Sequence, residues 1–274
     1  MSLILNSNSS VGLASAMVGR STRRIESSTE TLATGLRINN AADDAAGLGV
    51  STHLNARAAS GRVAMRNAND AVSMLQTADS ATDEVVNLLT RIRELAVESA
   101  SDTLASTERA YTEAEVGELK VEIARIAEVT EFNDFKLTDG SVTQLGVQVG
   151  VNNRAADRFD IGFIDLTTTS LGVVDINVAT IADAQKAIDL ADAALDSIGA
   201  ERARLGALIN RAESAYETIE NYAETTTSSA SKIEDADFAY ETAELTASQI
   251  LQQSAVSVLS QAKSMNESAI QLIS

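Results

Sequence analysis

The sequence predicts a mainly α-helical protein, an elongated helical rod of long coiled-coil-like helices with one small β-hairpin. Over most of the chain, apolar residues alternate at spacings of three and four, which is the period of one helix face. The chain also contains no proline, where average usage of roughly 5% would give about 14 residues. Because proline breaks helix interiors, its absence favours long helices.

The N-terminal segment has the spacing of a coiled-coil seam in which large and small residues alternate. Small residues at every second core position let a partner helix approach closely, to about 8 Å between the axes. The large residues recur every seven positions, and they are Ile4, Val11, Val18, Ile25 and Leu32. A small residue stands three positions after each of them, and these are Ser7, Ala14, Ser21, Ser28 and Gly35.

The C-terminal segment, Ala243 to Ser274, repeats this design with alanine as the small residue. We therefore predict that the two ends of the chain pair with each other. Further apolar residues lie off the seam, and a helix that is apolar around most of its girth is buried on several sides. We expect neighbouring copies in an assembly to cover it; the alternative is an ordinary core helix. The predicted packing positions at this end are Leu251, Ala255, Val258, Ala262, Met265, Ala269 and Leu272.

A loop and a long helix are expected after the first segment. Gly35 and Asn39–Asn40 predict a helix end and a loop. Asp43 and Asp44 then stand where carboxylates cap the free amides of a starting helix, and we favour capping because no catalytic base or metal ligand stands nearby. The apolar spacing continues over residues 45–100, on the order of 80 Å as a helix. A compact globule of this chain length would be only about 50 Å across, which is why a rod is expected.

The only β-like pattern lies in the second half of the middle. After a break at residues 99–103 and a shorter helix, apolar residues alternate on either side of Asn152–Asn153, which predicts a hairpin near 144–164. Another long helix is expected from Ile181, with the run from Thr225 to Ser231 breaking it. The predicted organisation is a pair of terminal helices, residues 1–42 and 231–274, and a helical bundle carrying the hairpin, residues 43–230.

Composition excludes several classes of function. The formal net charge is −18, of which residues 41–230 carry −16; this acidic middle is expected to face solvent. Nucleic acid is excluded as a partner because phosphate binding needs clustered Lys and Arg. The absence of cysteine excludes disulfides, zinc thiolates and thiol catalysis. The single histidine, His53, has no nucleophile motif around it, so we predict no enzyme, no metal and no cofactor.

Three blocks of the sequence carry a resemblance to one family. The run LATGLRIN followed by ADDAAGL, between Leu32 and Leu48, resembles the N-terminal signature of bacterial flagellins. The run LGALINRAES from Leu205 resembles a flagellin helix motif. The C-terminal signature of flagellins is similar to SKIEDADFA from Ser231, QILQQS from Gln249 and VLSQA from Val258. The resemblance covers nearly the whole chain, with its blocks in the family's order.

This resemblance implies the structural subunit of the bacterial flagellar filament, a helical homopolymer used for swimming. In flagellins the paired terminal helices line the filament core and the central bundle forms a shell around it. The resemblance also implies flagellar junction and cap proteins and an export chaperone as partners, and type III export to the extracellular filament without a cleaved signal peptide. Because residues 139–180 hold only the hairpin and a loop, we expect a short form that lacks the outer variable domains.

Two further sites are candidates. The segment from Arg91 to Leu95 resembles one that an innate-immune Toll-like receptor recognises in some flagellins, with Glu115 as a second contact. Thr90 stands where recognised flagellins often have glutamine, and the alternative is that Leu95 packs in the bundle while the charges are solvated. Some flagellins are also glycosylated, and the only long predicted loop offers hydroxyls for O-glycans; the alternative there is an ordinary polar turn. These hydroxyls belong to Thr167, Thr168, Thr169 and Ser170.

Two alternative functions stay open at this point. One is a flagellar hook–filament junction protein, which shares the terminal helices; the block from Gln249 to Gln253 favours flagellin. The other is a secreted helical protein that lies on membranes. Such amphipathic helices carry Lys- and Arg-rich polar faces, which this sequence lacks, and no apolar run approaches the ~18 residues that a membrane span needs. No membrane partner is therefore expected.

Overall fold

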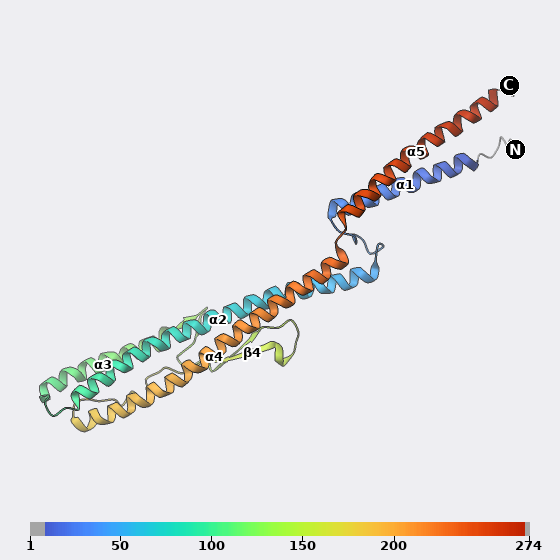
Figure 1. The fold of residues 1–274 in the computed structure, drawn as a ribbon. Helices are drawn as coiled ribbons and strands as arrows, with labels where there is room; N and C mark the ends of the chain where they lie inside the picture. Colours follow the sequence, from blue (N-terminus) through green and yellow to red (C-terminus); the bar gives the residue numbers. More distant parts are fainter. Residues whose placement is uncertain (1–8, 272–274) are drawn as a thin grey trace. The chain divides into compact units, whose positions relative to one another are not determined.

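The structure, a computed structural model, describes residues 9–271 and is built almost entirely of helices (Figure 1). The helices are α1 (Ser9–Thr34), α2 (Ala45–Ser99), α3 (Ser106–Val129), α4 (Ile181–Glu234) and α5 (Phe238–Gln271), with a short 3-10 helix at Ala155–Asp157. The strands are β1 (Glu131–Phe132), β2 (Phe135–Lys136), β3 (Gln144–Gln148) and β4 (Arg158–Gly162). The prediction of a mainly helical fold with little β structure is confirmed.

The chain divides into two compact units. The terminal unit comprises residues 1–56 and 225–274, and the central unit comprises residues 57–224. Helices α2 and α4 each contribute residues to both units. The terminal unit therefore extends to residue 56 and begins again at residue 225, whereas the predicted limits were 42 and 231. The reason is that the first turns of α2 and the last turns of α4 belong with the terminal helices.

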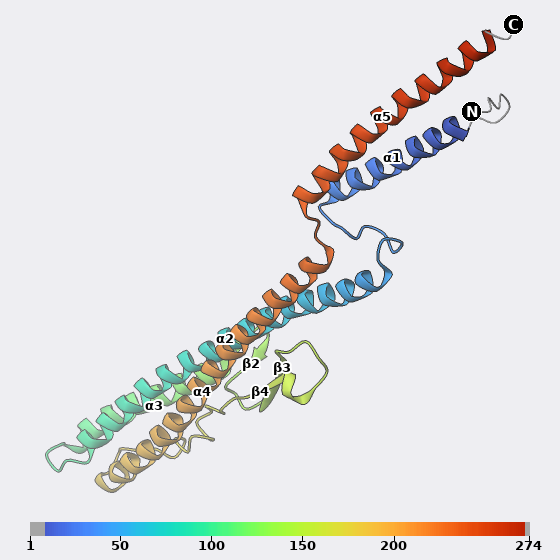
Figure 2. The same ribbon diagram turned by 45° about the vertical axis from the view of Figure 1, so that its right-hand side comes forward.

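In the terminal unit, α1 and α5 lie side by side and run in opposite directions (Figures 1 and 2). The residues buried between them are small, so the contact consists mainly of serine, threonine and alanine. On α1 these are Ala14, Ser21, Ser28 and Thr31, and on α5 they are Ser248 and Ala255.

Helix α4 does not break at Thr225–Ser231, so that prediction is wrong. The helix continues to Glu234. Within the run, the Ser229 hydroxyl donates to the Thr225 carbonyl oxygen at 2.8 Å, while Thr226 and Ala230 are buried. Serine and threonine have only a weak intrinsic preference against helix, and packing overrides it. The helix ends at Glu234 instead. The next residue, Asp235, forms an isolated antiparallel bridge with Leu36.

The core of the central unit has two parts. One joins α2, α3 and the first half of α4, and it includes a stretch between β4 and α4 whose buried residues are Leu166, Leu171, Val173, Ile176 and Val178. The other lies where the β3–β4 hairpin covers α2 and α4, with Phe159 and Ile161 of β4 buried against both helices. The stretch predicted as a polar loop is therefore anchored in the core.

The predicted hairpin forms as β3 and β4, with Leu145 opposite Ile161 and Val147 opposite Phe159. A second hairpin, β1–β2, was not predicted. Its strands have two residues each, too few for any alternation to be visible in the sequence. Its turn places Asn133 and Asp134 at φ of 49° and 66°, a left-handed conformation that Asn and Asp adopt more readily than most residues.

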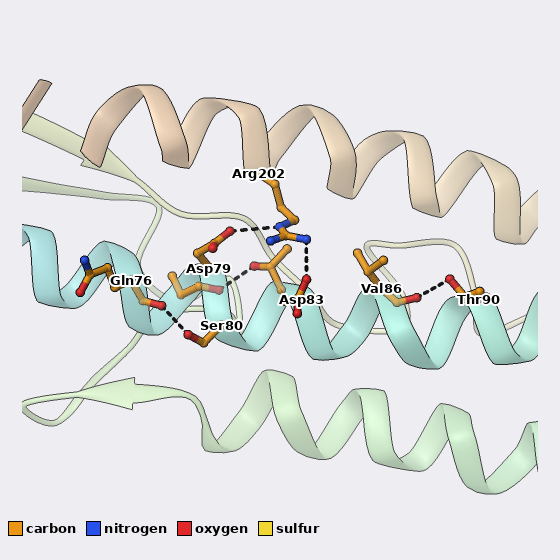
Figure 3. A network of polar contacts seen from close by, with 9 residues as sticks. Gln76, Asp79, Ser80, Asp83, Val86, Thr90 and Arg202 are labelled. Carbon is orange, nitrogen blue, oxygen red and sulfur yellow. Dashed lines mark hydrogen bonds and ion pairs between the residues drawn. The ribbon is translucent and has the colours of Figure 1, made fainter. Parts of the chain in front are cut away.

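The one charged residue within the apolar spacing of α4, Arg202, joins α4 to α2. Its guanidinium donates to Asp79 at 3.1 Å and to Asp83 at 2.6 Å (Figure 3). The two carboxylates lie on successive turns of α2, so one arginine satisfies both. The hydrogen bonds and charges of these carboxylates raise the pKa of Arg202 above its ordinary value, which keeps the guanidinium charged.

Candidate assembly surface

On α1, the predicted seam faces α5. The large positions Val11, Val18, Ile25 and Leu32 are half-buried, and the small positions Ala14, Ser21 and Ser28 are buried. Gly35 ends the helix: its φ is +73°, a conformation that glycine adopts without strain, and its N–H donates to the Thr31 carbonyl at 2.8 Å. Ile4 and Ser7 lie outside the described residues.

On α5, the contact with α1 uses a different stripe from the predicted one. The predicted large positions are exposed, Leu251 and Val258 at 53% and Met265 at 73%. The residues that face α1 are Ser248, Gln252, Ala255, Leu259 and Ala262. Both stripes share Ala255 and Ala262, so heptad spacing could not separate them. The observed stripe differs from the predicted one by Ser248, Gln252 and Leu259, and the Gln252 amide donates to the Thr22 hydroxyl of α1 at 3.0 Å. The side chains of Ala269 and Leu272 are not among those described.

The exposed stripe opens onto an apolar hollow between the two helices. The hollow has a volume of about 310 Å³ and is lined by Met17 and Ser21 of α1 and by Leu251, Ala255 and Val258 of α5, among others. Leu13 and Met17 are also exposed on this part of α1. Charge is sparse here: Arg20 and Arg24 border the hollow, and Arg24 pairs with Glu244 at 3.6 Å. An apolar surface of this kind indicates an interaction site.

The contact between α1 and α5 also contains polar groups that weaken it. The Ser248 side chain is 1% exposed, and its hydroxyl has no hydrogen-bond partner among the residues that the structure describes. The Gln252 amide donates to the Thr22 hydroxyl at 3.0 Å. A buried hydroxyl without a partner costs roughly 1–3 kcal/mol. The pair therefore gains less from burial than a seam of large apolar residues would.

Of the two aspartates after the first helix, Asp44 caps the next helix as predicted, whereas Asp43 binds loop amides instead. The Gly47 N–H donates to Asp44 at 2.8 Å, which caps the start of α2. Asp43 accepts from the N–H groups of Asn39 and Asn40 at 3.0 and 2.8 Å and so closes the loop. Within the described part of the chain, no group of three or more His, Cys, Asp or Glu residues is placed to hold a metal ion. Within those same residues, no helix has an apolar stretch long enough to cross a bilayer.

The candidate receptor residues lie on α2 and α3. Arg91 donates to Glu115 and the pair is exposed, with the closest nitrogen and oxygen 2.7 Å apart. The hydrogen bond from Arg91 to Glu115 is the largest of the effects that raise the pKa of Arg91. Leu95 is only 1% exposed and belongs to the core shared by α2, α3 and α4. Only the two charged residues are thus available on the surface.

The four candidate glycan residues lie in the anchored stretch before α4. Thr169 and Ser170 are exposed, whereas Thr167 and Thr168 are half-buried. The Thr167 hydroxyl accepts from the Ser170 N–H at 3.4 Å, and the Thr168 carbonyl accepts from the Val173 N–H at 3.0 Å. The segment is an ordered turn with two free hydroxyls.

Comparison with known proteins gives one consistent family. Residues 5–143 match the bacterial flagellin N-terminal helical region, and residues 188–273 match the bacterial flagellin C-terminal helical region. A flagellin of Halalkalibacterium halodurans is 37% identical over 273 residues, covering 99% of this chain and 100% of its own. A flagellin of Listeria innocua is 35% identical over 89% of this chain and 90% of its own.

Solved structures agree with this result. The crystal structure of Bacillus cereus flagellin aligns with a TM-score of 0.51 and 31% identity, over 56% of this chain and 88% of that chain. A structure from Vibrio parahaemolyticus, described as a flagellar hook-associated protein, aligns with a TM-score of 0.60 over 70% of this chain and 100% of that chain. Its identity is 11%, so this second likeness concerns the fold alone.

Proposed function

Because the chain belongs to the bacterial flagellin family, it is a structural subunit of the extracellular flagellar filament for swimming motility, and we propose that α1 and α5 supply its packing surface in the filament core. Flagellins are structural proteins, so the protein is not an enzyme. The subunit polymerises with copies of itself. Its packing in the core would involve the seam positions of both terminal segments, from Ile4 to Leu32 and from Leu251 to Leu272.

One observation carries this proposal, namely the exposed apolar stripe of Leu251, Val258 and Met265 beside the hollow at Met17. The described part of the chain leaves these side chains more than half exposed, although leaving them in water forgoes about 25 cal/mol for each Å² that could be buried. In a filament, α1 and α5 of neighbouring subunits would cover them. The same residues therefore contact water in the free subunit and other copies in the polymer.

The direct test is the substitution Val258→Asp. A carboxylate buried without a partner costs on the order of several kcal/mol, so this variant should fail to form filaments while its central unit stays folded. Seeded polymerisation observed by electron microscopy measures the first property, and circular dichroism of the free subunit measures the second. The control is Asn87→Asp, which adds the same charge at an exposed position of α2 and should polymerise. Filaments of normal yield from Val258→Asp would exclude α5 as a core helix.

The partners of the family fit the same surface. We propose that junction proteins and cap proteins meet the subunit at the filament ends through α1 and α5, and that an export chaperone covers the apolar stripe of α5 before export. Export would proceed through the flagellar type III apparatus without cleavage of the N-terminus. Mass spectrometry of the N-terminal peptide from filaments tests this last point, because a cleaved leader would remove the residues that begin with Met1.

Recognition by a Toll-like receptor is a separate proposal and is confined to the exposed pair of Arg91 and Glu115. Leu95 would support their positions from within the core. If the pair is a receptor contact, Arg91→Ala should lower activation of receptor-bearing reporter cells, and Thr90→Gln should raise it. Equal activation by both variants and the parent protein would leave the pair with a structural role only.

Glycosylation would use Thr169 and Ser170, the two exposed hydroxyls of the turn, before Thr167 or Thr168. The central unit has no further domain between β4 and α4 that could cover them, consistent with a short form of the family. The intact mass of filament protein is decisive, because each hexose or larger sugar adds a discrete increment. A mass equal to that of the sequence would exclude modification of this turn.

A further inference from the structure

The methionines of the chain divide between two kinds of environment. The sequence contains five of them, and Met1 lies outside the described residues. In the central unit, Met74 is 4% exposed and belongs to the core that the β3–β4 hairpin covers, while Met65 is half-buried against the same core. In the terminal unit, Met17 of α1 and Met265 of α5 are 50% and 73% exposed. The two most accessible methionines that the structure describes therefore lie on the terminal helices.

Both exposed methionines belong to the apolar surface of α1 and α5. Met17 lines the hollow of about 310 Å³ together with Leu251 and Val258. Met265 follows Val258 by seven positions and so continues the same stripe of α5. Leucine and valine resist mild oxidation, whereas a thioether does not. The two methionines are therefore the positions at which this apolar surface can be changed chemically.

The composition of the chain directs a mild oxidant to these thioethers. There is neither cysteine nor tryptophan in the sequence, so no more reactive side chain intercepts the oxidant first. The sulfur attacks one oxygen of hydrogen peroxide, the O–O bond breaks, and the departing hydroxide takes the proton of the transferred hydroxyl to become water. The sulfur is oxidised by two electrons to the sulfoxide, and the peroxide is reduced by the same two. Because hydrogen peroxide is uncharged, the net charge of −18 does not repel it.

A sulfoxide changes the surface because it replaces an apolar sulfur by a polar S–O group. Such a group is stable in water and costs free energy when it is buried without a hydrogen-bond donor. Arg20 borders the hollow and can donate to a sulfoxide at Met17. The stripe at Met265 offers less compensation, because Lys263 stands two positions away and residues spaced by two do not share a helix face. Met265 should therefore have the larger effect.

We infer that Met17 and Met265 form an oxidation-sensitive site, through which hydrogen peroxide stops a free subunit from joining a filament. The site is accessible whether or not α1 and α5 are paired, since the pairing leaves both side chains at least half exposed. Once a subunit is incorporated, neighbouring copies cover both thioethers and protect them. This inference rests on the proposed role of α1 and α5 as assembly surfaces, and it adds a chemical modification that acts on that surface before assembly.

The first test measures the site and the effect in the parent protein. Free subunits are treated with hydrogen peroxide, the excess is removed with catalase, and the product is mixed with seeds. Peptide mass spectrometry should find the added oxygen at Met265 and Met17 well before Met74. Seeded elongation should slow about tenfold, which corresponds to about 1.4 kcal/mol. Methionine sulfoxide reductases with a dithiol, which becomes a disulfide as water is released, should restore the elongation rate.

Partial oxidation gives a competition within one sample and needs no substitution. When a partly oxidised mixture elongates seeds, subunits with a sulfoxide at Met265 or Met17 should stay in the soluble fraction. We expect filaments to be depleted of them about tenfold, in line with the slower elongation. Sulfoxide at Met65 is the internal control, because this residue belongs to the central unit and its oxidised form should enter filaments as readily as the unoxidised form.

Protection in the filament is measured by oxidising intact filaments and free subunits side by side. Sulfoxide at Met17 and Met265 should form about tenfold more slowly in the filaments, because neighbouring subunits exclude the oxidant. Equal rates in the two samples would overturn the protection and would also count against the proposed packing of α5.

Leucine variants assign the effect to individual residues. Leucine has nearly the volume of methionine and no oxidisable sulfur, and each variant is compared with its own elongation rate before treatment. The double variant, Met17→Leu with Met265→Leu, should keep that rate after peroxide, and Met265→Leu alone should keep more of it than Met17→Leu alone. Met65→Leu is the matched control, since it removes a methionine of the central unit and should lose as much of its rate as the parent protein does.

Each remaining outcome bears on one claim. Normal elongation by parent subunits that carry sulfoxide at both residues overturns the inference, and so does an equal loss of rate in the double leucine variant. If the double variant fails to elongate even without treatment, the competition in the partly oxidised parent decides alone, and an even distribution overturns the inference. The filament function stands in each of these cases. Failure of untreated parent subunits to elongate seeds counts instead against the proposed assembly function.

Discussion

Ser248 is the residue at which the contact between α1 and α5 is weakest. Its hydroxyl is buried between the two helices and has no hydrogen-bond partner within residues 9–271. Burial of a polar group without a partner opposes folding. The residue therefore keeps the isolated pair of helices near the limit of stability, while it leaves the exposed stripe of α5 unaffected.

Ser248→Ala should make the helix pair of the free subunit more stable by about 1–2 kcal/mol, because it removes the buried hydroxyl and raises helix propensity. The helical signal in far-ultraviolet circular dichroism should increase, and amide exchange in α5 should slow. Ser260→Ala is the control, since Ser260 is exposed on the same helix and gains propensity only. Equal effects of the two substitutions would show that the buried hydroxyl costs nothing.

A second residue-scale effect is the acid sensitivity of the bridge between α2 and α4. Arg93 donates to Asp192 at 2.5 Å, and this hydrogen bond, followed by the arginine charge, lowers the pKa of Asp192 below its ordinary 3.8. A carboxylate with a lowered pKa in the folded state stabilises the fold above its unfolded pKa. That stabilisation is lost as the pH falls through the folded pKa.

The expected result is a difference in melting temperature between the parent protein and Asp192→Asn that is present at pH 7, begins to shrink near the unfolded pKa of about 4, and is lost as the pH falls through the lowered pKa of Asp192. High salt should reduce it as well, because both side chains are largely exposed. Asp196→Asn is the control, as Asp196 is exposed on the same helix and has no ion pair or hydrogen bond within residues 9–271. A difference that persists at pH 2 would mean that Asp192 acts through packing and not through charge.

At the scale of elements, the start of α2 depends on a close approach at Gly47. An added Cβ would lie 2.3 Å from an Asp44 carboxylate oxygen and 2.8 Å from the Ile38 side chain. Any other residue here must displace the carboxylate that caps the helix or the buried side chain of Ile38. The sequence block that carries the family resemblance therefore has a physical explanation, since its glycines and aspartates end one helix and begin the next.

Gly47→Ala should destabilise the free subunit by about 1–2 kcal/mol through the lost cap, with partial compensation from helix propensity. Gly49→Ala is the matched control: Gly49 lies in the same helix with nothing within 4 Å of an added Cβ, so alanine there should stabilise by up to about 1 kcal/mol. Urea denaturation of both variants measures the effect. The same sign of change in both would contradict the steric argument.

The exposed stripe of α5 shows how an element can serve two contacts. Ser248, Gln252 and Leu259 face α1, while Leu251, Val258 and Met265 face away from the buried contact. A helix that is apolar on more than one side requires more than one partner. Helix α5 has one partner within the described chain, and the filament supplies the others.

At the scale of the whole molecule, assembly and folding of the ends are coupled. The contact between α1 and α5 buries mainly serine, threonine and alanine, while ordering a residue costs about 1–2 kcal/mol for the backbone alone. The free subunit is thus expected to have poorly ordered ends and a stable central unit. Neighbouring subunits add the buried area that shifts this balance toward ordered helices.

Limited proteolysis of the free subunit should therefore remove roughly the first 40 and the last 40 residues and leave a stable middle, whereas the filament should resist. Mass spectrometry of the fragments locates both limits. Ends that resist protease in the free subunit as well as the middle does would refute the coupling.

The sequence by itself determined the helices, the hairpin and the caps. The apolar period placed α2 and the start of α4, the alternation around Asn152 placed β3 and β4, and Asp44 and Gly35 marked helix ends, because these features depend on neighbours within one or two turns. Where the local signal was weak, packing decided. Thr225–Ser231 stayed helical because Thr226 and Ala230 are buried, and the stretch from Leu166 to Val178 became part of the core.

Only the tertiary structure decided which stripe of α5 meets α1. The stripe of Leu251 and Val258 and the stripe of Gln252 and Leu259 share the same alanines, so the spacing is compatible with both. The choice depends on residues of α1 that are distant in the sequence, such as Thr22, whose hydroxyl accepts from the Gln252 amide across 230 positions. The contact between the two connecting segments is of the same kind, since the hydrogen bond from Arg37 to the Ile233 carbonyl spans 196 positions. A periodic pattern indicates which faces of a helix are apolar, whereas the partner on each face depends on shape across the chain.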